Sequence, residues 1–275
     1  MTIQKFRNTV WKYYLREGRH DLPWRKTHDP YKILVSEIML QQTQVERVKS
    51  FYKDWLEKFP TVEILAQAPL GDVLRAWQGL GYNRRAKMLH DAAKMVVKEH
   101  NGKVPTSPED LEQLPGVGPY TARAVAAFSA NATVVFIETN LRTVVTHYFF
   151  PDATEKVKDT DILAILEKAY PKAIEGKSLS REWYAALMDY GAHLKRSGVR
   201  INNKSASYTK QSTFAGSDRQ ARGAILRELA KGPATRVRLL GLLGDNRQDQ
   251  LAQVLEKLLT EDLVEKRGAK YQLPI

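Results

Sequence analysis

The sequence contains no cysteine among its 275 residues. This absence excludes a disulfide scaffold, a zinc finger, a thiol nucleophile and a cysteine-ligated iron–sulfur cluster, although it leaves the redox compartment open. No run approaches 18 apolar residues, and the first residues have no apolar signal-peptide core. We therefore expect a soluble cytoplasmic protein that does not span or bind a membrane.

Acidic residues are also few, since 31 Asp and Glu oppose 43 Lys and Arg and leave a formal charge of +12. Such an excess indicates a polyanionic partner. The stretch 190–215 has no Asp or Glu but carries several basic residues, and a second basic cluster is Arg84-Arg85-Ala86-Lys87. Each cluster could also be an ordinary solvated face. The candidate contacts in the long basic stretch are Lys195, Arg196, Arg200 and Lys204.

Apolar residues recur with helical spacing over most of the first 195 residues, and Pro or Gly separates the runs. No convincing alternating strand pair occurs before residue 260. The pattern predicts an all-α globule of short helices. The clearest runs lie at residues 31–42, 45–58, 61–67, 70–78, 84–99, 108–113, 119–130, 138–148, 159–170 and 180–194.

The last third of the chain changes character. Residues 196–216 are polar and basic, so we expect a basic connecting loop there. Three helical runs follow, at residues 218–230, 235–243 and 247–260, and then two short strands around a Gly turn. This order predicts a small winged-helix-like domain over 217–275, with helices plus a short β-hairpin. The same segment could also be a packing or protein-interaction domain.

The sharpest local feature is the string Leu114-Pro115-Gly116-Val117-Gly118-Pro119-Tyr120-Thr121-Ala122. A Pro-Gly-x-Gly turn between two amphipathic runs predicts a tight helix–hairpin–helix over residues 111–125. Its glycines permit left-handed backbone angles, and the first amides of the second helix can bind a phosphate. A Gly-rich turn alone would more often be a plain helix connection.

Three further motifs occur in order before this string, and with it they resemble the helix-hairpin-helix DNA glycosylases. The motifs also look like those of the MutY-like adenine DNA glycosylases, over roughly residues 5–195. The resemblance implies a two-lobed fold, with a six-helix barrel lobe over 29–135 and a second helical lobe from 1–28 and 136–195. The motifs are Leu22-Pro23-Trp24-Arg25, Ser36-Glu37-Ile38-Met39-Leu40-Gln41-Gln42-Thr43-Gln44-Val45 and Gly79-Leu80-Gly81-Tyr82-Asn83-Arg84-Arg85-Ala86.

The resemblance implies catalytic roles for Glu37, Glu138 and Tyr120. Glu37 matches the acid that protonates adenine, which would need a raised pKa in a desolvated pocket. Glu138 stands where the family usually has Asp, so it could stabilise the sugar cation or could serve only as an acid at a helix N-terminus. Tyr120 replaces the Lys of bifunctional relatives, which implies a glycosylase without lyase activity. Without the resemblance, Glu37 could be an acid on an exposed helix face, and Tyr120 could be an ordinary aromatic residue of the core.

The resemblance also implies a double-stranded DNA partner that contains a mismatch or a damaged base. Gln42 and Tyr82 look like the residues that probe the helix at the flipped-out site, and they could otherwise be buried or packing residues. Arg84 and Arg85 become expected phosphate contacts. Gly116 and Gly118 form the hairpin, whose carbonyls near Leu114 and Val117 could hold a monovalent cation; no other metal is expected.

Two departures from the family affect cofactor and specificity. Relatives usually carry an iron–sulfur cluster on four cysteines. Because this sequence has no cysteine, we expect no cluster here and no other cofactor. Residues 217–275 are too few for the family's Nudix-like domain that recognises 8-oxoguanine and lack its β-rich pattern, so we expect no such domain in them. We expect a monomeric base-excision-repair enzyme in the nucleoid of a prokaryotic cell, which removes adenine opposite 8-oxoguanine or guanine. The alternatives are a glycosylase for thymine or uracil opposite guanine and a catalytically weak damage-binding protein.

Overall fold

The computed structural model describes residues 1–171, 178–209 and 213–275. The chain forms two compact units, which are described separately below. The first contains Met1–Glu37, Pro105–Gln113 and Val117–Lys210, and the second contains Ile38–Val104, Leu114–Gly116 and Gln211–Ile275. The domain boundaries expected from the sequence stay a prediction, and residues 210–212 of the expected basic loop lie outside the described residues.

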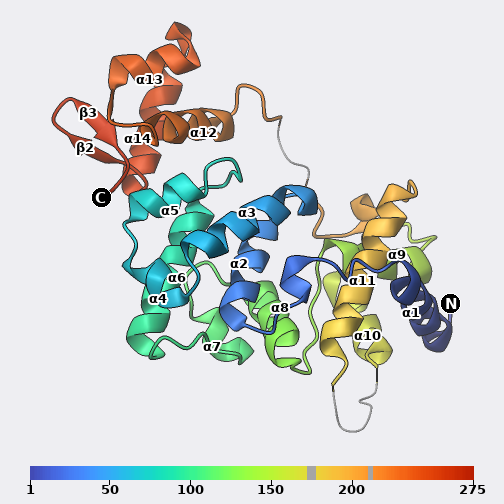
Figure 1. The fold of residues 1–275 in the computed structure, drawn as a ribbon. Helices are drawn as coiled ribbons and strands as arrows, with labels where there is room; N and C mark the ends of the chain where they lie inside the picture. Colours follow the sequence, from blue (N-terminus) through green and yellow to red (C-terminus); the bar gives the residue numbers. More distant parts are fainter. Residues whose placement is uncertain (172–177, 210–212) are drawn as a thin grey trace. The chain divides into compact units, whose positions relative to one another are not determined.

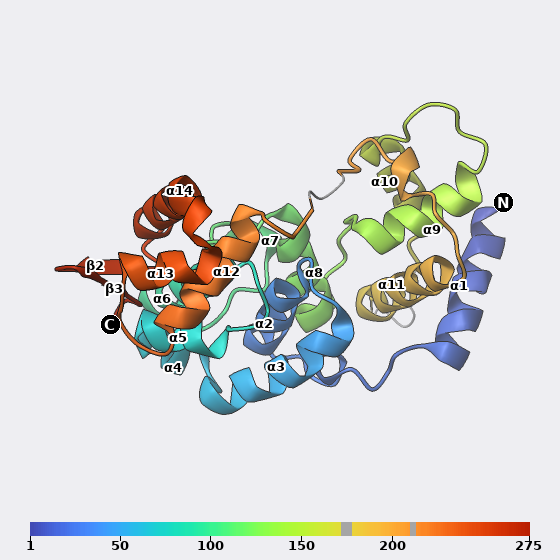
Figure 2. The same ribbon diagram turned by 90° about the horizontal axis from the view of Figure 1, so that it is seen from above.

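In the first unit, a long helix packs against two others. Helix α11 (Ser180–Arg196) lies against α1 (Ile3–Glu17) and α9 (Thr139–Phe149), and α10 (Asp159–Ala169) packs on α9 (Figures 1 and 2). The unit also contains α7 (Pro108–Glu112) and α8 (Pro119–Ala130). They form around the hairpin string, as the sequence predicts.

Helix α1 was not among the helices expected from the sequence. Thr2 caps its N-terminus, since its side chain accepts from the Lys5 amide. Phe6, Val10 and Tyr14 recur every four residues and form the buried stripe of the helix. Polar and basic residues separate them, which obscures the pattern in the sequence.

The contact of α11 with α9 depends on Gly191. A Cβ built on this residue would lie 2.5 Å from the carbonyl oxygen of Asn140 and 2.6 Å from its Cβ. Real Cβ atoms do not approach a backbone so closely, so only glycine lets the two helices meet here. The N-terminus of α9 is thereby held close to α11.

The second unit begins with the end of α2 (Pro30–Leu40) and continues through four helices, in agreement with the sequence. Its core contains the fully buried side chains of Trp55 and Trp77, whose ring centroids lie 5.3 Å apart in an edge arrangement. Helices α4 and α5 pack on α6. The helices are α3 (Val45–Lys58), α4 (Val62–Gln67), α5 (Leu70–Ala76) and α6 (Arg84–Glu99).

Residues 217–275 of the second unit form what we call the C-terminal module. It contains α12 (Asp218–Leu229), α13 (Arg236–Leu243) and α14 (Gln248–Thr260), followed by the expected hairpin of β2 (Glu265–Arg267) and β3 (Lys270–Gln272) (Figure 2). A third strand, β1 (Ala234–Thr235), pairs antiparallel with β3 and gives the order β1-β3-β2. Strand β1 was not expected from the sequence, because two residues are too few to show an alternating pattern.

The C-terminal module is packed onto α5. A Cβ built on Gly71 would lie 2.3 Å from the carbonyl oxygen of Pro274, so the tail of the chain lies directly against this helix. The neighbouring Leu273 is buried, and Arg75 Nε donates to the carbonyl oxygen of Ala230 at 3.3 Å. These contacts fix the module on the helices of the second unit.

All the described helices are too short or too polar to cross a membrane. The helical architecture with a short C-terminal hairpin confirms the fold class expected from the sequence.

Candidate active site

Glu37 is a carboxylic acid on an apolar helix. Its neighbours Val35 and Ile38 in α2 are buried, and only 6% of Glu37 itself is exposed. Desolvation raises the pKa of Glu37 from its usual 4.5 to about 7. This pKa of about 7 includes smaller effects, since the nearby negative charge of Glu138 also raises it, while a hydrogen bond from Tyr120 and the charge of Arg25 lower it. Near neutral pH this carboxyl group can therefore give or accept a proton.

Tyr120 lies in the first turn of α8 and donates its hydroxyl proton to Glu37 Oε2 at 3.0 Å. Its ring packs edge-on against Phe136, with the centroids 5.7 Å apart, and Phe136 stacks on Tyr184 at 3.8 Å. Burial, and then the charge of Glu37, raise the pKa of Tyr120 well above its usual value. The hydroxyl therefore stays protonated and acts as a donor.

Glu138 caps the N-terminus of α9. Its Oε1 accepts from the backbone amides of Asn140 at 2.7 Å and Leu141 at 2.9 Å. Asp, Asn, Ser and Thr are the usual residues at such a cap, because their side chains are short enough to fold back on the helix. The backbone of Glu138 is extended, with φ −142° and ψ 179°, as is usual for an N-cap residue. The helix amides therefore hold the carboxylate in a fixed orientation.

A polar chain connects Glu138 to Lys195. Asn140 Nδ2 donates to Glu138 Oε2 at 3.2 Å, and Lys195 Nζ donates to Asn140 Oδ1 at 2.8 Å. Desolvation lowers the pKa of Lys195. Burial raises the pKa of Glu138, although the amide of Asn140 and the charge of Lys195 oppose the shift. The site thus contains two carboxyl groups with raised pKa values and one lysine whose charge favours ionised Glu138.

The first unit therefore brings together all three catalytic candidates, Glu37, Tyr120 and Glu138. The place of Lys195 beside Asn140 was not expected, because the sequence pattern suggested a phosphate contact for every lysine and arginine of the basic stretch 190–215 that was named as a candidate. The sequence signal for this position was that Lys195 follows an amphipathic run directly, which places it in the last turn of a helix.

A buried ion pair that sequence reasoning also missed holds the Leu-Pro-Trp-Arg motif in place. Asp189 is 1% exposed and accepts from Arg25 at 2.6 and 2.8 Å and from Arg19 at 2.6 Å. An acid among the apolar residues of α11 was the signal in the sequence. The pair anchors residues 19–25 to α11 and places the charge of Arg25 near Glu37.

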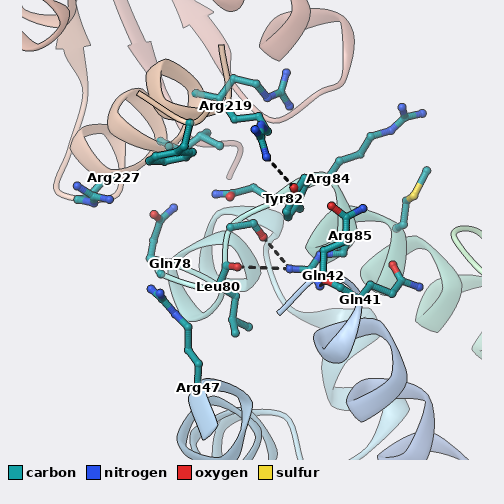
Figure 3. Close-up of a pocket in the computed structure, with 18 residues that line it drawn as sticks. Gln41, Gln42, Arg47, Gln78, Leu80, Tyr82, Arg84, Arg85, Arg219 and Arg227 are labelled. Atoms are coloured by element: carbon teal, nitrogen blue, oxygen red, sulfur yellow. Dashed lines mark hydrogen bonds between the residues drawn. The ribbon is translucent and has the colours of Figure 1, made fainter. Parts of the chain in front are cut away.

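Gln42 and Tyr82, the candidate helix-probing residues, are both exposed in the second unit. Each has a left-handed backbone, with φ 55° and 48°, and both line one cavity together with Arg84 (Figure 3). Such angles are uncommon for residues other than glycine and often mark functional loops.

The candidate hairpin glycines differ in their surroundings. Gly116 has φ 77°, and a Cβ there would lie 2.7 Å from Met88 Cβ, so this position requires glycine. Gly118, the N-cap of α8, has no heavy atom within 4 Å of a built Cβ. The cation expected near Leu114 and Val117 stays a prediction.

Arg85 differs from its expected role as a phosphate contact. Only 8% of it is exposed, and its guanidinium donates to the carbonyl oxygens of Ile38 at 2.8 Å, Gln41 at 2.6 Å and Gly81 at 3.0 Å. Desolvation lowers its pKa to about 10, so it stays charged. This position argues against a phosphate contact, because the buried N–H groups of Arg85 already donate to carbonyl oxygens in the loops that carry Gln42 and Tyr82 (Figure 3).

The described part of the basic loop is tied to the first unit by its own polar groups. Arg200 donates to the Lys195 carbonyl and Lys204 to the Pro151 carbonyl, while the amide of Val157 donates to the carbonyl of Lys204 at 2.8 Å. Arg196 ends α11 and is exposed. Arg196 and Arg200 thus remain candidates for DNA contact, and Lys204 is half-buried.

The residues present do not fit the iron–sulfur cluster that the resemblance implies. A cluster of this kind needs cysteine thiolates, and the sequence has none. Among the described residues, no group of three or more His, Asp and Glu side chains could hold another metal ion. Hydrogen bonds, rather than metal ligands, fasten the described residues of the loop.

Comparison with known proteins identifies the family. Residues 35–172 match the family described as HhH-GPD superfamily base excision DNA repair protein. The chain is 38% identical over 269 residues to an adenine DNA glycosylase of Mycolicibacterium smegmatis, which covers 90% of this chain and 89% of that protein. It is also 38% identical over 288 residues to the adenine DNA glycosylase of Mycobacterium tuberculosis, covering 95% and 91%.

Solved structures agree with this result. A thermostable thymine-DNA glycosylase superposes with a TM-score of 0.61 at 27% identity, covering 69% of this chain and 86% of that one. A trapped endonuclease III–DNA covalent intermediate gives 0.57 at 20% identity, with coverages of 73% and 89%, and supports the fold alone. The helix-hairpin-helix fold expected from the motifs is confirmed, and the chain belongs to the HhH-GPD superfamily of base excision DNA repair proteins, within the family of the adenine DNA glycosylases.

Proposed function

We propose that this chain is a monofunctional DNA glycosylase that hydrolyses the N-glycosidic bond of adenine mispaired with 8-oxoguanine or guanine. The observation that carries the proposal is Glu37, a buried acid with a pKa of about 7, hydrogen-bonded to Tyr120 and electrostatically coupled to Glu138. The names of the relatives that are 38% identical support adenine as the base.

Glu37 supplies the proton that the reaction needs. Adenine must leave the base stack to be reached, and it is a poor leaving group unless it is protonated. In its neutral form Glu37 donates a proton to the imidazole ring of adenine as the bond from the sugar C1′ to N9 breaks. A pKa of about 7 leaves roughly half of the enzyme in this form at neutral pH. The base then departs as neutral adenine.

Glu138 supports the other half of the reaction. As the bond breaks, the sugar acquires oxocarbenium character, and a fixed carboxylate stabilises that positive charge. The amides of Asn140 and Leu141 hold Glu138 in place, and Lys195 favours its ionised form. Water adds to C1′ and loses a proton, for which Glu37, now ionised, is the nearby acceptor. The products are free adenine and an abasic site.

Strand cleavage is not expected, because Tyr120 lacks an amine. Lyases of this class form a Schiff base between a lysine and C1′. The Tyr120 hydroxyl is instead engaged with Glu37 and stays protonated. The enzyme therefore stops at the abasic site.

Double-stranded DNA would be held by phosphate contacts and by insertion at the flipped base. The amides after Gly118, at the start of α8, can bind a phosphate. Arg84, Arg196 and Arg200 are exposed cations that can add contacts. Gln42 and Tyr82 are the exposed residues that would fill the space left by the base.

Thymine or uracil opposite guanine is the second candidate, because a thymine-DNA glycosylase is among the similar structures at 27% identity. The raised pKa of Glu37 argues against a third candidate, a binding protein without chemistry, since a binding role gives no reason to bury an acid whose pKa lies near neutral pH.

One experiment separates these functions. The protein is incubated with duplexes that each carry one mispair, and alkali then cleaves any abasic site. Cleavage only at adenine opposite 8-oxoguanine or guanine supports the proposal, and cleavage only at pyrimidines supports the second candidate. E37Q should abolish turnover and keep binding, whereas the exposed control E57Q should keep both. Substantial turnover by E37Q would remove Glu37 from the acid role.

A further inference from the structure

The second unit contains a cavity of about 870 Å³ that is dominated by arginine (Figure 3). Its described lining includes no Asp or Glu. Like charges that converge on one cavity repel one another and are relieved when an anion binds. The arginines that line it are Arg47, Arg84, Arg85, Arg219, Arg222 and Arg227.

The two walls of the cavity come from different segments. One wall contains the loops of Gln42 and Tyr82, and the other contains Arg219 and Arg227 of α12 (Figure 3). Phe214, which precedes α12, also lines the cavity. Arg219 joins the two walls, since its NH1 donates to the Tyr82 hydroxyl at 3.0 Å and its Cζ lies 6.0 Å from the centre of the Phe214 ring. The contact of α5 with the chain end around Pro274 holds the second wall in position.

The arginines that line the cavity differ in their contacts and in their exposure. Arg85 is buried against carbonyl oxygens, and Arg222 forms an ion pair with Glu261. Arg47, Arg84 and Arg227 are exposed, and Arg219 is half-exposed. These four cations reach solvent in the cavity, and Arg219 does so while it donates to the Tyr82 hydroxyl.

Two exposed aromatic rings lie among these cations. Tyr82 is 37% exposed and Phe214 is 60% exposed, and both line the cavity. A large exposed aromatic ring beside arginines is typical of surfaces that bind nucleic acid, because bases stack on the ring while the cations meet the phosphates. Stacking of this kind requires a base that has left the double helix.

We propose that this cavity extends the DNA-contact surface of Gln42 and Tyr82 onto the C-terminal module, where Arg219 and Arg227 bind backbone phosphates and the preceding Phe214 stacks on an unstacked base. The inference deepens the proposed function and rests on it. A free nucleotide shares the chemistry of base and phosphate, but cations spread over both walls fit a run of phosphates better. The C-terminal module is then part of the substrate-binding surface.

The test measures DNA binding in the E37Q background, which leaves the substrate intact. Dissociation constants for duplexes with an adenine–8-oxoguanine pair or a matched pair are measured by fluorescence anisotropy at several salt concentrations. R219A should weaken binding about 5- to 20-fold and reduce the slope of log K against log salt by about 1. F214A should weaken binding to the mispaired duplex about 5- to 10-fold, with the salt slope unchanged.

Matched controls lie in the same module outside the cavity lining. R267A removes one exposed cation, and V237A removes an apolar side chain that is 81% exposed. Equal losses in R219A and R267A, or in F214A and V237A, would overturn the proposal. ATP that binds with Arg219-dependent affinity while duplex binding is unaffected by R219A would also overturn it in favour of a free nucleotide.

The same variants with Glu37 intact separate this inference from the proposed function. Wild-type cleavage of mispaired adenine, with no effect of R219A or F214A on binding, defeats the cavity proposal alone. Binding that depends on Arg219 and Phe214, without base release from any duplex, supports the cavity proposal and defeats the proposed chemistry. Both side chains are at least partly exposed, and a thermal melt of each variant verifies that the fold is retained.

Discussion

The hydroxyl of Tyr120 donates a hydrogen bond of 3.0 Å to Oε2 of Glu37, a residue 83 positions earlier in the chain. This bond favours the charged carboxylate, whereas desolvation favours the neutral acid. Desolvation is the larger effect and leaves the pKa of Glu37 at about 7. Tyr120 thus keeps a strongly desolvated acid within the pH range in which it can act.

Removing this hydroxyl should shift the pH profile. In Y120F the pKa of Glu37 should rise, so the alkaline limb of the single-turnover rate should move to higher pH. The rate at neutral pH should fall only about 3- to 10-fold, as for the loss of one hydrogen bond. The matched variant Y208F, which alters a tyrosine that is 50% exposed, should leave the profile unchanged. A limb that moves to lower pH in Y120F would contradict this account of the site.

Introducing an amine at the same position should create lyase chemistry. Wild-type protein treated with borohydride during turnover should form no covalent adduct with DNA, because a phenol cannot form a Schiff base. Y120K should form such an adduct, visible as a shifted band on a denaturing gel. Strong trapping by the wild-type protein would disprove the monofunctional assignment.

Glu37 should reduce stability above neutral pH. Its folded-state pKa of about 7 exceeds the usual 4.5, so wild-type stability falls as pH rises from 4.5 to 7. E37Q cannot ionise and should be more stable by at most about 3 kcal/mol at pH 8, with no advantage below pH 4.5. Thermal melts at both pH values measure the difference, and E57Q serves as the exposed control. An E37Q advantage that is equal at pH 4 and pH 8 would show that ionisation is not its cause.

The two roles of Glu138 can be separated. E138Q keeps an oxygen that can accept from the Asn140 and Leu141 amides, so it should lose less than about 1 kcal/mol of stability. It lacks the negative charge, and the single-turnover rate should therefore fall at least about 100-fold. E138A should lose both the cap and the rate. Near wild-type rates in E138Q would reduce Glu138 to a helix cap.

Gly191 should be required for the geometry of the site. G191A places a methyl group 2.5 Å from the Asn140 carbonyl and should destabilise the protein by about 1–3 kcal/mol. Activity should fall as well, because the start of α9 carries Glu138. G241A is the matched control, since a Cβ there meets nothing within 4 Å in α13. Chemical denaturation and the single-turnover rate measure both effects, and a G191A protein as stable as G241A would argue against the close contact.

Helix bounds and the hairpin could be predicted from the sequence because their causes are local. Apolar spacing and Pro or Gly breaks act within a few residues, and observed helices such as 45–58, 84–99 and 119–130 have the expected limits. The same local information failed for β1, which is only two residues long, and for α1, whose apolar stripe is thin. Motif strings also selected Glu37, Tyr120 and Glu138 as candidates.

What the sequence could not decide is which side chains are buried and what they contact. Arg85 and Lys195 stand in basic clusters that suggested phosphate contacts, yet Arg85 is buried against carbonyl oxygens and Lys195 donates to Asn140. The pKa of Glu37 likewise depends on a tyrosine 83 positions away and on burial by helices distant in sequence. The sequence by itself determined most of the helices, the family motifs and the absence of cluster ligands. Desolvation and long-range partners arise only when distant segments pack together, so only the tertiary structure decided which ionisable groups can do chemistry.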